Sequence, residues 1–302
     1  MTQSRVVVLD PVVDMARLTA MIAGLPLSLE AGREALHDAS GLVALLVGPE
    51  TVLTTADVTV LRDLRLVVAT SAGKDHLPEA TLREAGVEVV DCAGYCTDEV
   101  ADHTIALILD LLRAITVADR EVRRLRWSHQ GRPRQIAGTR LAIAGLGRIG
   151  QAVAARALAL GMEVAAYDPY QHATSFEGVT RVASLPALLA ACDVLTLHLP
   201  LRADAYHLIG AAELELMPRG SYLVNVARGG LVDEAAVAAA VRSGQLGGAA
   251  FDVLAAEPPS AGEILLQTPG ITITPHSAWY SPEAERRLTD VAGAALAARL
   301  AP

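Results

Sequence analysis

The chain has 302 residues, a length that favours two domains, each large enough to bury its own core. Its net charge of −9 argues against a nucleic-acid partner, and no run of about 18 apolar residues predicts a membrane span, although 52% of the residues are hydrophobic. Its three cysteines, Cys92, Cys96 and Cys192, are too few for a disulfide framework and lie in no cluster with metal-site spacing. We therefore expect a metal-free protein of the reducing cytoplasm.

Apolar, β-branched runs alternate with helical patterns along the chain, which is typical of parallel α/β folds. The first expected strands are residues 5–9, 43–47, 66–70 and 87–91. One long helix is then expected over 98–124, because its apolar residues recur at helical spacing. Its length suits a spine between two lobes or a subunit interface. Residues 127–138, rich in Gly, Pro and Arg, predict a loop.

A second α/β series begins near residue 140. Strand 141–144 leads through a glycine-rich turn into a helix at 149–160. The later expected strands are 164–168, 193–198, 221–226, 248–252 and 271–274. A last helix, about 282–300, could return to the first lobe and make that domain discontinuous.

The turn at 145–150 carries the G-x-G-x-x-G pattern, with Gly145, Gly147 and Gly150 at its three glycine positions. The first glycine would permit the tight turn, and the second would let the backbone approach a pyrophosphate. The third would let helix and strand pack closely. The helix that follows would offer its positive N-terminal end to the phosphates. The turn therefore predicts a dinucleotide site, with a purely structural glycine turn as the alternative.

Asp168 ends the next expected strand, 18 positions after Gly150. A carboxylate there would accept hydrogen bonds from the adenosine ribose hydroxyls. The two residues that follow, Pro169 and Tyr170, carry no positive charge to pair a 2′-phosphate. The sequence therefore predicts NAD(H) rather than NADP(H).

Three later segments each place a polar side chain just after a strand, where ligands bind in open α/β sheets: Arg228, Glu257 and His276. Arg228 is a permanently charged fork suited to a substrate carboxylate. His276 can exchange a proton with a carbonyl or hydroxyl oxygen near neutral pH. Glu257 would hold the tautomer of the histidine and raise its pKa. Taken alone, each of these three side chains also has an ordinary structural explanation. Together, and following a dinucleotide turn, they predict hydride transfer at C2 of a small 2-hydroxy or 2-keto acid.

These motifs resemble the D-isomer-specific 2-hydroxyacid dehydrogenase family, which includes phosphoglycerate dehydrogenase-like enzymes and the C-terminal-binding proteins. The likeness covers nearly the whole chain and is strongest over 94–282. It implies a flavodoxin-like substrate domain, 1–98 plus 278–302, with a Rossmann NAD domain, 99–277, inserted into it. It also implies a homodimer formed largely through the NAD domain. Beyond the glycines, the cofactor contacts that it implies are Arg148, Ile149, Asp168, His198, Leu199, Pro200, Ala227, Asp252 and Thr97.

The segment beginning at His276 most resembles the C-terminal-binding-protein branch, in which Trp279 would line the substrate pocket; alternatively it packs at the seam between the domains. The family's substrate loop usually reads Gly-Ala-Gly-aliphatic-Asp, and here residues 71–75 read Ser71-Ala72-Gly73-Lys74-Asp75. Ser71 replaces a common glycine, and Lys74 adds a cation. Lys74 would recognise a second anionic group of the substrate or be a solvated loop residue.

Three other functions remain open. Formate dehydrogenases share the architecture but carry Gln where Glu257 stands, which disfavours them. Phosphite dehydrogenases also use Arg, Glu and His. A non-catalytic NAD(H)-sensing protein of corepressor type is the alternative from another class, and the intact Arg, Glu and His set favours catalysis over it.

Overall fold

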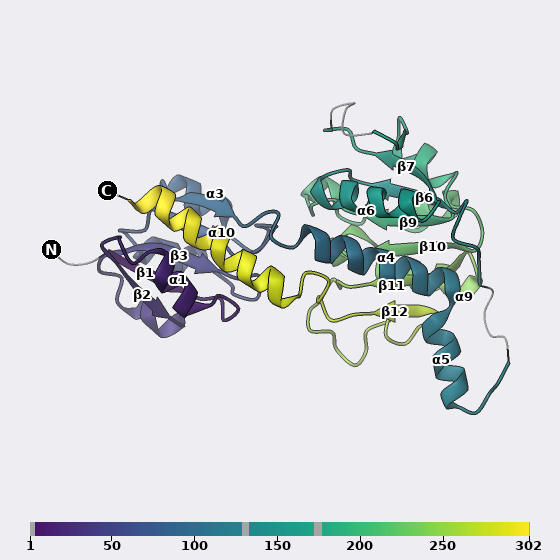
Figure 1. Cartoon of the computed structure of the whole chain (residues 1–302), viewed down its shortest axis with the longest axis horizontal. Coiled ribbons are helices and arrows are strands. Elements are labelled where there is room, and N and C mark those ends of the chain that lie inside the picture. The colour runs from purple at the N-terminus through teal and green to yellow at the C-terminus, as the bar shows by residue number, and fades with distance from the viewer. Residues whose placement is uncertain (1–3, 129–132, 172–176, 302) are drawn as a thin grey trace. The chain divides into compact units, whose positions relative to one another are not determined.

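The computed structural model describes residues 4–128, 133–171 and 177–301. The chain forms two compact units, each built on a parallel sheet with helices packed against it (Figure 1). Unit 1 comprises residues 1–96 and 280–302, and unit 2 comprises residues 97–279. The expected domain boundaries, 98/99 and 277/278, lie close to these divisions.

Unit 1 contains a five-stranded sheet in the order β2-β1-β3-β4-β5, which is the flavodoxin-like order. Its strands are β1 (Ser4–Val8), β2 (Leu27–Ala31), β3 (Leu42–Val47), β4 (Leu66–Ala69) and β5 (Glu88–Asp91). The central strand β3 is buried along its whole length because helices cover both faces of such a sheet. The sequence did not predict β2, an edge strand without a single fully buried residue.

The helices of unit 1 come from both ends of the chain: α1 (Met15–Met21), the 3₁₀ turn η1 (Arg33–His37), α2 (Thr55–Val60), α3 (Glu79–Glu84) and α10 (Pro282–Leu300). The hydroxyl of Ser281 caps α10 by accepting a hydrogen bond from the amide of Ala284 at 2.9 Å. Helix α10 packs on α1 and β4. The last helix therefore returns to unit 1, as the sequence predicted.

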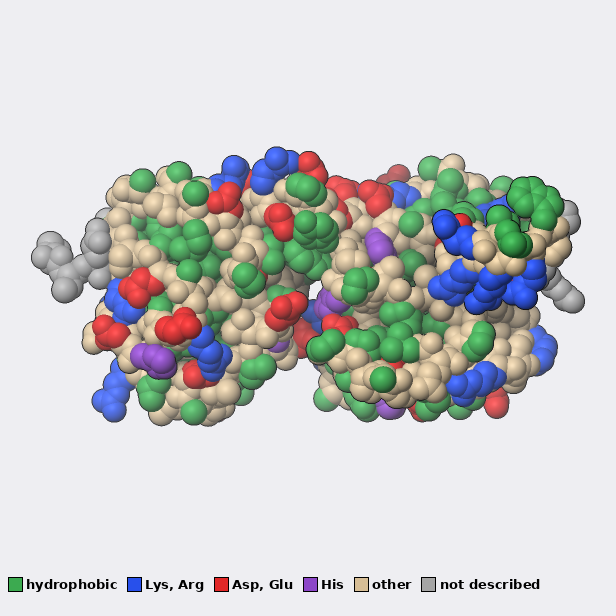
Figure 2. All heavy atoms as spheres, turned by 90° about the horizontal axis from the view of Figure 1, so that it is seen from below, with side chains coloured by type: hydrophobic (Ala, Val, Ile, Leu, Met, Phe, Trp, Pro, Cys, Tyr) green, Lys and Arg blue, Asp and Glu red, His purple; other side chains and the backbone are tan. Residues whose placement is uncertain are grey.

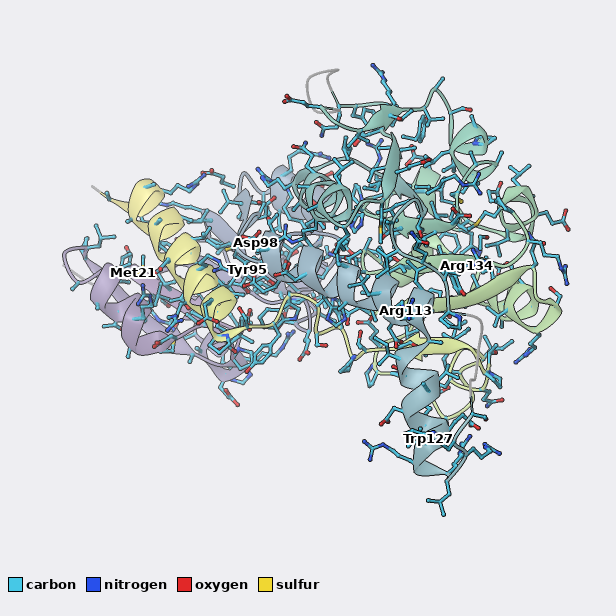
Figure 3. All side chains as sticks on the ribbon, turned by 45° about the vertical axis from the view of Figure 1, so that its right-hand side comes forward. Met21, Tyr95, Asp98, Arg113, Trp127 and Arg134 are labelled. Atoms are coloured by element: carbon cyan, nitrogen blue, oxygen red, sulfur yellow. The ribbon has the colours of Figure 1, made fainter. Side chains whose placement is uncertain are left out.

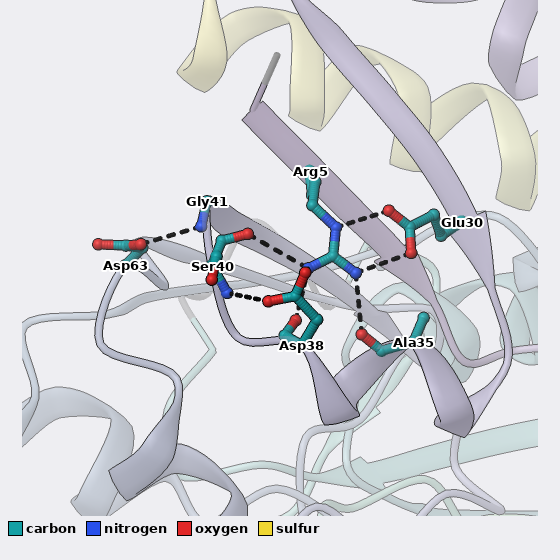
Figure 4. Close-up of polar contacts among 7 residues, drawn as sticks. All are labelled: Arg5, Glu30, Ala35, Asp38, Ser40, Gly41 and Asp63. Carbon is teal, nitrogen blue, oxygen red and sulfur yellow. Dashed lines mark hydrogen bonds and ion pairs between the residues drawn. The ribbon is translucent and has the colours of Figure 1, made fainter. Parts of the chain in front are cut away.

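Arg5 fastens the edge of this sheet (Figure 4). Its guanidinium donates two hydrogen bonds to the carboxylate of Glu30 on β2, at 2.6 and 2.7 Å. It also donates to the carbonyl oxygens of Ala35 and Ser40, at 3.0 and 3.2 Å. One side chain on β1 thus ties the neighbouring strand to η1 and the loop after it.

Unit 2 contains a seven-stranded parallel sheet in the order β12-β11-β10-β9-β6-β7-β8, in which β6 is the first strand of a Rossmann arrangement. Its strands are β6 (Arg140–Ala144), β7 (Glu163–Tyr167), β8 (Thr180–Arg181), β9 (Val194–Leu197), β10 (Ser221–Asn225), β11 (Leu246–Phe251) and β12 (Ile271–Ile273). The predicted fold class is confirmed: a Rossmann unit is inserted into a flavodoxin-like one.

The single long helix expected over 98–124 is wrong. The structure has α4 (Thr97–Arg113) and α5 (Ile115–Arg123), which meet at Ala114 in the left-handed conformation with φ +53°. The carboxylate of Asp110 accepts a hydrogen bond from the amide of Thr116 at 2.7 Å, which replaces a helical backbone bond at the break. Helix α5 therefore leaves the direction of α4 and projects from unit 2 (Figure 1). Of the loop expected at 127–138, residues 129–132 lie outside the described residues.

The remaining helices of unit 2 are α6 (Arg148–Ala159), α7 (Leu185–Leu189), the 3₁₀ turns η3 (Ala203–Ala205) and η4 (Gly229–Leu231), α8 (Ala211–Leu216) and α9 (Glu234–Ser243). Helix α4 packs on α6, and Arg156 of α6 bonds to both Asp98 and Asp102 of α4. Within the described ranges, no helix is long and apolar enough to cross a bilayer.

Candidate active site

The turn between β6 and α6 is shaped by its three glycines. Gly145 has φ +92°, and a Cβ atom there would lie 2.5 Å from the carbonyl oxygen of His198. A Cβ atom on Gly150 would lie 2.2 Å from the carbonyl oxygen of Gly145. At Gly147 a Cβ atom would meet nothing within 4 Å. Two glycines are thus required by packing within the protein, whereas the middle one leaves an open backbone that a dinucleotide could approach.

Helix α6 starts at this turn, and no described side chain caps its N-terminus. Arg148 is exposed there, and Ile149 is half-buried. The unpaired amides of the first helical turn, and the positive end of the helix dipole, suit a phosphate. The open backbone at Gly147 and the uncapped helix therefore fit the pyrophosphate of a dinucleotide.

Asp168 joins the end of β7 to the glycine turn. Only 8% of its surface is exposed, and its carboxylate accepts hydrogen bonds from the amides of Leu146 and Tyr170, at 2.8 and 2.9 Å. The guanidinium of Arg202, from the loop after β9, lies 5.7 Å from the centre of the Tyr170 ring. The residues that directly follow Asp168 give no sign of this cation, because Arg202 lies in a later loop, far from Tyr170 in the chain.

His198 follows β9 and lies against the glycine turn. Its Nε2 is 3.0 Å from the hydroxyl oxygen of Thr196, and burial lowers the pKa of its ring to about 3. The ring is therefore neutral at physiological pH. Leu199 is half-buried with its Cδ2 against the same turn, and Pro200 is exposed.

Arg228 follows β10 in a loop shaped by the buried side chain of Asn225. The Asn225 amide donates to the carbonyl oxygen of Arg228 at 2.8 Å and accepts from the amide of Ala227 at 3.1 Å. A Cβ atom at Gly229 would lie 2.0 Å from the carbonyl carbon of Leu254. The Arg228 loop thus packs directly against the segment that leads to Glu257.

Glu257 and His276 form a direct hydrogen bond, with Oε2 and Nδ1 2.6 Å apart. The other carboxylate oxygen of Glu257 accepts from the amide of Leu254 at 2.7 Å. Burial would raise the pKa of Glu257, but the bonds from His276 and Leu254 outweigh it, so this pKa is lowered. The bond to Glu257 raises the pKa of His276 against the opposing effect of burial. The positive charge of Arg228 lowers the pKa of both groups, and all three predicted catalytic residues belong to unit 2.

Asp252 holds the backbone around His276. The residue is only 2% exposed, and its carboxylate accepts hydrogen bonds from the amides of Ser277 and Ala278, each at 2.9 Å. Its own carbonyl oxygen accepts from the amide of His276 at 2.8 Å. His276 has φ +50°, an unfavourable conformation for a residue other than glycine. These bonds keep the histidine loop in that conformation.

The expected substrate loop lies in unit 1, after β4. The hydroxyl of Ser71 donates to the carbonyl oxygen of Gly73 at 2.5 Å, and Ala72 is exposed. Lys74 is half-buried, with Nζ 3.8 Å from Oε2 of Glu79. The loop is therefore held by its own contacts, and the lysine already has an acidic neighbour.

Thr97 and Trp279 lie at the first and last positions of unit 2, and both are half-buried. In the described part of the chain, no three His, Cys, Asp or Glu side chains form a cluster that could hold a metal ion.

The residues that match a known family model lie within unit 2. Residues 105–278, more than half of the chain, match the model of the D-isomer specific 2-hydroxyacid dehydrogenase, NAD binding domain. The chain is 40% identical over 239 residues to a glycerate dehydrogenase from Methylorubrum extorquens, covering 76% of this chain and 74% of that protein. It is 32% identical over 286 residues to a D-3-phosphoglycerate dehydrogenase from Archaeoglobus fulgidus, covering 93% of this chain but only 54% of that protein.

Among solved structures, D-lactate dehydrogenase from Aquifex aeolicus, complexed with NAD and lactic acid, resembles the chain with a TM-score of 0.88 and 26% identity. The match covers 98% of this chain and 95% of that one. The family model, the sequence relatives and the open dinucleotide turn agree. The chain belongs to the D-isomer-specific 2-hydroxyacid dehydrogenase family, and residues 105–278 are its NAD-binding domain.

Proposed function

We propose that this protein catalyses the reversible reduction of a small 2-keto acid to the D-2-hydroxy acid with NADH. One observation carries the proposal: Nδ1 of His276 lies 2.6 Å from Oε2 of Glu257, with the charge of Arg228 acting on both. A carboxylate-supported histidine beside a guanidinium suits proton transfer to the oxygen of a bound keto acid. The similarity to a glycerate dehydrogenase and a D-3-phosphoglycerate dehydrogenase supports this class of substrate.

NAD(H), when bound, supplies or accepts the hydride. We assign its pyrophosphate to Gly145, Gly147 and Gly150 with Arg148 and Ile149, because this turn combines an open backbone with an uncapped helix. Asp168 would accept from the adenosine ribose hydroxyls. The remaining residues that we assign to the cofactor site are His198, Leu199, Pro200, Ala227, Asp252 and Thr97.

The protein's own groups would act as follows. Arg228 would bind the carboxylate of the acid as a fork and fix the plane of its carbonyl group. Nδ1–H of His276 donates to Glu257, which leaves Nε2 to carry the transferred proton. During reduction, Nε2–H would protonate the C2 oxygen, and the ionised Glu257 would stabilise the charged ring. In the reverse direction, neutral Nε2 would take the proton from the hydroxyl group.

The substrate loop would supply further contacts with the acid. We propose that the backbone of Ser71, Ala72 and Gly73 contacts the substrate carboxylate. Lys74 would exchange its contact with Glu79 for a second anionic group of the substrate. Trp279 would favour a larger, apolar group attached to C2.

We also propose that the protein acts as a homodimer through the arm, which we define as residues 115–127. Leu125 and Trp127 are 94% and 89% exposed, and Ile115 is also exposed. The arm also carries several arginines, whereas the whole chain has a net charge of −9. A second copy therefore offers apolar surface for the exposed apolar side chains and acidic groups for the arginines. Figure 2 views the molecule from the side on which α5 projects and shows basic and apolar side chains gathered together there. Figure 3 shows Trp127 at the arm, away from the sheet of unit 2.

The buried cysteines Cys92, Cys96 and Cys192 form no disulfide, which suits the reducing cytoplasm that we propose as the compartment.

The function is tested by following NADH consumption with a panel of 2-keto acids: glyoxylate, pyruvate, hydroxypyruvate, 3-phosphohydroxypyruvate and larger apolar members. We expect turnover with at least one acid and a loss of about 1000-fold in kcat/KM for Arg228→Leu. Tight NADH binding without turnover of any acid would contradict the proposal and favour an NAD(H)-sensing protein. NADH formation from phosphite and NAD alone would favour phosphite oxidation.

A further inference from the structure

His103 of α4 makes a contact with the active-site region that its sequence position gives no sign of. Its Nε2 lies 3.0 Å from Oγ1 of Thr274, 171 positions later in the chain, and 3.7 Å from Oδ1 of Asp252. Thr274 donates its hydroxyl proton to Asp252 Oδ1 at 2.5 Å. The threonine oxygen is then free only to accept, so His103 presents Nε2–H to it. The three side chains form one directed chain of hydrogen bonds that ends on the Asp252 carboxylate.

This carboxylate is buried, so its orientation depends on its protein donors. Oδ1 accepts from Thr274 and from the amide of Ser277, and Oδ2 accepts from the amide of Ala278. A buried carboxylate is stable only while such donors satisfy it. The hydroxyl of Thr274 is the side-chain donor in this group, and His103 fixes its rotamer. Loss of His103 would free that hydroxyl to rotate away from Asp252.

The backbone that Asp252 holds is the turn at His276, with φ +50°. A non-glycine residue in this conformation is strained and persists only where its surroundings hold it there. Here the amides of residues 276–278 donate hydrogen bonds to Asp252, and these bonds hold the turn in its conformation. A small rotation of the turn would displace the imidazole from Glu257 and from the reacting oxygen.

We propose that His103 is a positioning residue, which acts through Thr274 and Asp252 to hold the loop of His276 in its reactive conformation. The proposal rests on the proposed function for its catalytic meaning, but the hydrogen-bond chain can be tested without turnover. His103 itself is assigned no contact with cofactor or substrate.

The kinetic test compares His103→Leu, His103→Gln and Thr274→Val in the NADH-dependent reduction of the best acid. We expect His103→Leu to lower kcat about 10-fold, with both KM values within about two-fold of the wild type, because only the reacting geometry changes. The amide of Gln places an N–H donor near the position of Nε2, so His103→Gln should recover most of the loss. Asp102→Asn is the matched control, because this neighbour in α4 bonds to Arg156 instead and should leave kcat unchanged.

A double-mutant cycle separates this role from a general loss of packing. If both side chains act through one chain, His103→Leu combined with Thr274→Val should be no slower than the slower single variant. Fully additive losses, or an unchanged kcat in His103→Leu, would overturn the proposal.

Hydrogen exchange provides the readout that does not need activity. In His103→Leu, the amides of Ser277 and Ala278 should exchange at least about 10-fold faster, whereas those of β6 should not change. An inactive wild-type protein with this exchange pattern would refute the proposed function and leave the positioning chain standing. Unchanged exchange at both amides would refute the chain, whatever the activity.

Discussion

The imidazole of His276 and the carboxylate of Glu257 share a hydrogen bond of 2.6 Å, and the pKa values of the two groups move in opposite directions. The raised pKa of His276 means that the ring keeps its proton to higher pH than a free imidazole, whose pKa is about 6.5. In the proposed reaction, reduction uses the protonated ring, so the rate of reduction should persist below the raised pKa of His276 and fall as pH rises through it.

Glu257→Gln should move this alkaline limb to lower pH, by about one unit or more, because the charged hydrogen-bond acceptor is lost. In the oxidation direction, which needs the neutral ring, the acidic limb should move to lower pH as well. The measurement is kcat/KM against pH in both directions for wild type and variant. A profile that stays in place would show that another group titrates in the reaction.

The glycine turn offers a matched pair of substitutions. Gly150→Ala should lower the free energy of unfolding by about 2 kcal/mol or more, because its Cβ atom would lie 2.2 Å from a backbone oxygen. Gly147→Ala should leave stability within about 0.5 kcal/mol, because its φ of −70° suits alanine and its Cβ atom meets no protein atom. It should nevertheless weaken NADH binding at least about 10-fold, since the methyl group occupies the space assigned to the pyrophosphate. Denaturation and NADH titration of both variants check this, and undiminished NADH affinity in Gly147→Ala would place the cofactor elsewhere.

Cofactor choice should depend on the balance between Asp168 and Arg202. Asp168→Asn removes the negative charge that repels a 2′-phosphate while keeping an oxygen for the amide of Leu146. We expect kcat/KM with NADH to fall about 10-fold and that with NADPH to rise, because Arg202 lies over the neighbouring Tyr170 ring. Adding Arg202→Ala should abolish the gain with NADPH. If the double variant keeps that gain, Arg202 takes no part in the discrimination.

The apolar end of the arm should decide the oligomeric state. Burial of side chains the size of Leu125 and Trp127 contributes about 1.5–3 kcal/mol each, so Leu125→Glu with Trp127→Glu should convert a dimer into a monomer. Val60→Glu in unit 1, where the side chain is also exposed, is the control and should remain dimeric. Sedimentation velocity distinguishes the two states. A monomeric wild type would remove the case for a dimer.

Lys74 should affect the ranking of substrates rather than the chemistry. Lys74→Ala is expected to lower kcat/KM about 10-fold for an acid with a second anionic group, such as 3-phosphohydroxypyruvate, and to leave pyruvate within about two-fold. Glu79→Gln, which removes the acidic neighbour of the lysine, should raise kcat/KM for the acid with the second anionic group. Equal effects on both acids would identify Lys74 as an ordinary loop residue.

The sequence predicts most of this fold because buried parallel strands are continuous apolar runs and glycine turns have fixed geometry. The sequence did not predict strand β2, because an edge strand with partly exposed residues lacks a continuous apolar run. The break at Ala114 escaped prediction because alanine favours helix, and the Asp110 bond that stabilises the break depends on three-dimensional placement.

The candidate site could also be predicted only in part. The sequence predicts His276, Glu257 and Arg228 from their residue types at strand ends, and in the structure His276 bonds to Glu257 while the charge of Arg228 acts on His276. The supporting contacts of Asp252 with His103 and Thr274 join segments far apart in the chain, and no local pattern marks them. The likeness of the segment after His276 to the C-terminal-binding-protein branch stays a prediction.

Arg228, Glu257 and His276 all belong to unit 2, whereas the loop at 71–75 belongs to unit 1. In the proposed function, the acid–base residues and the loop that would recognise a second anionic group of the acid therefore lie in different compact units of one chain. Exchanging the loop at 71–75 between relatives should change the preference for such acids and leave the pH dependence of the recipient intact, which gives evolution a route to new metabolic niches without rebuilding the proton-transfer apparatus.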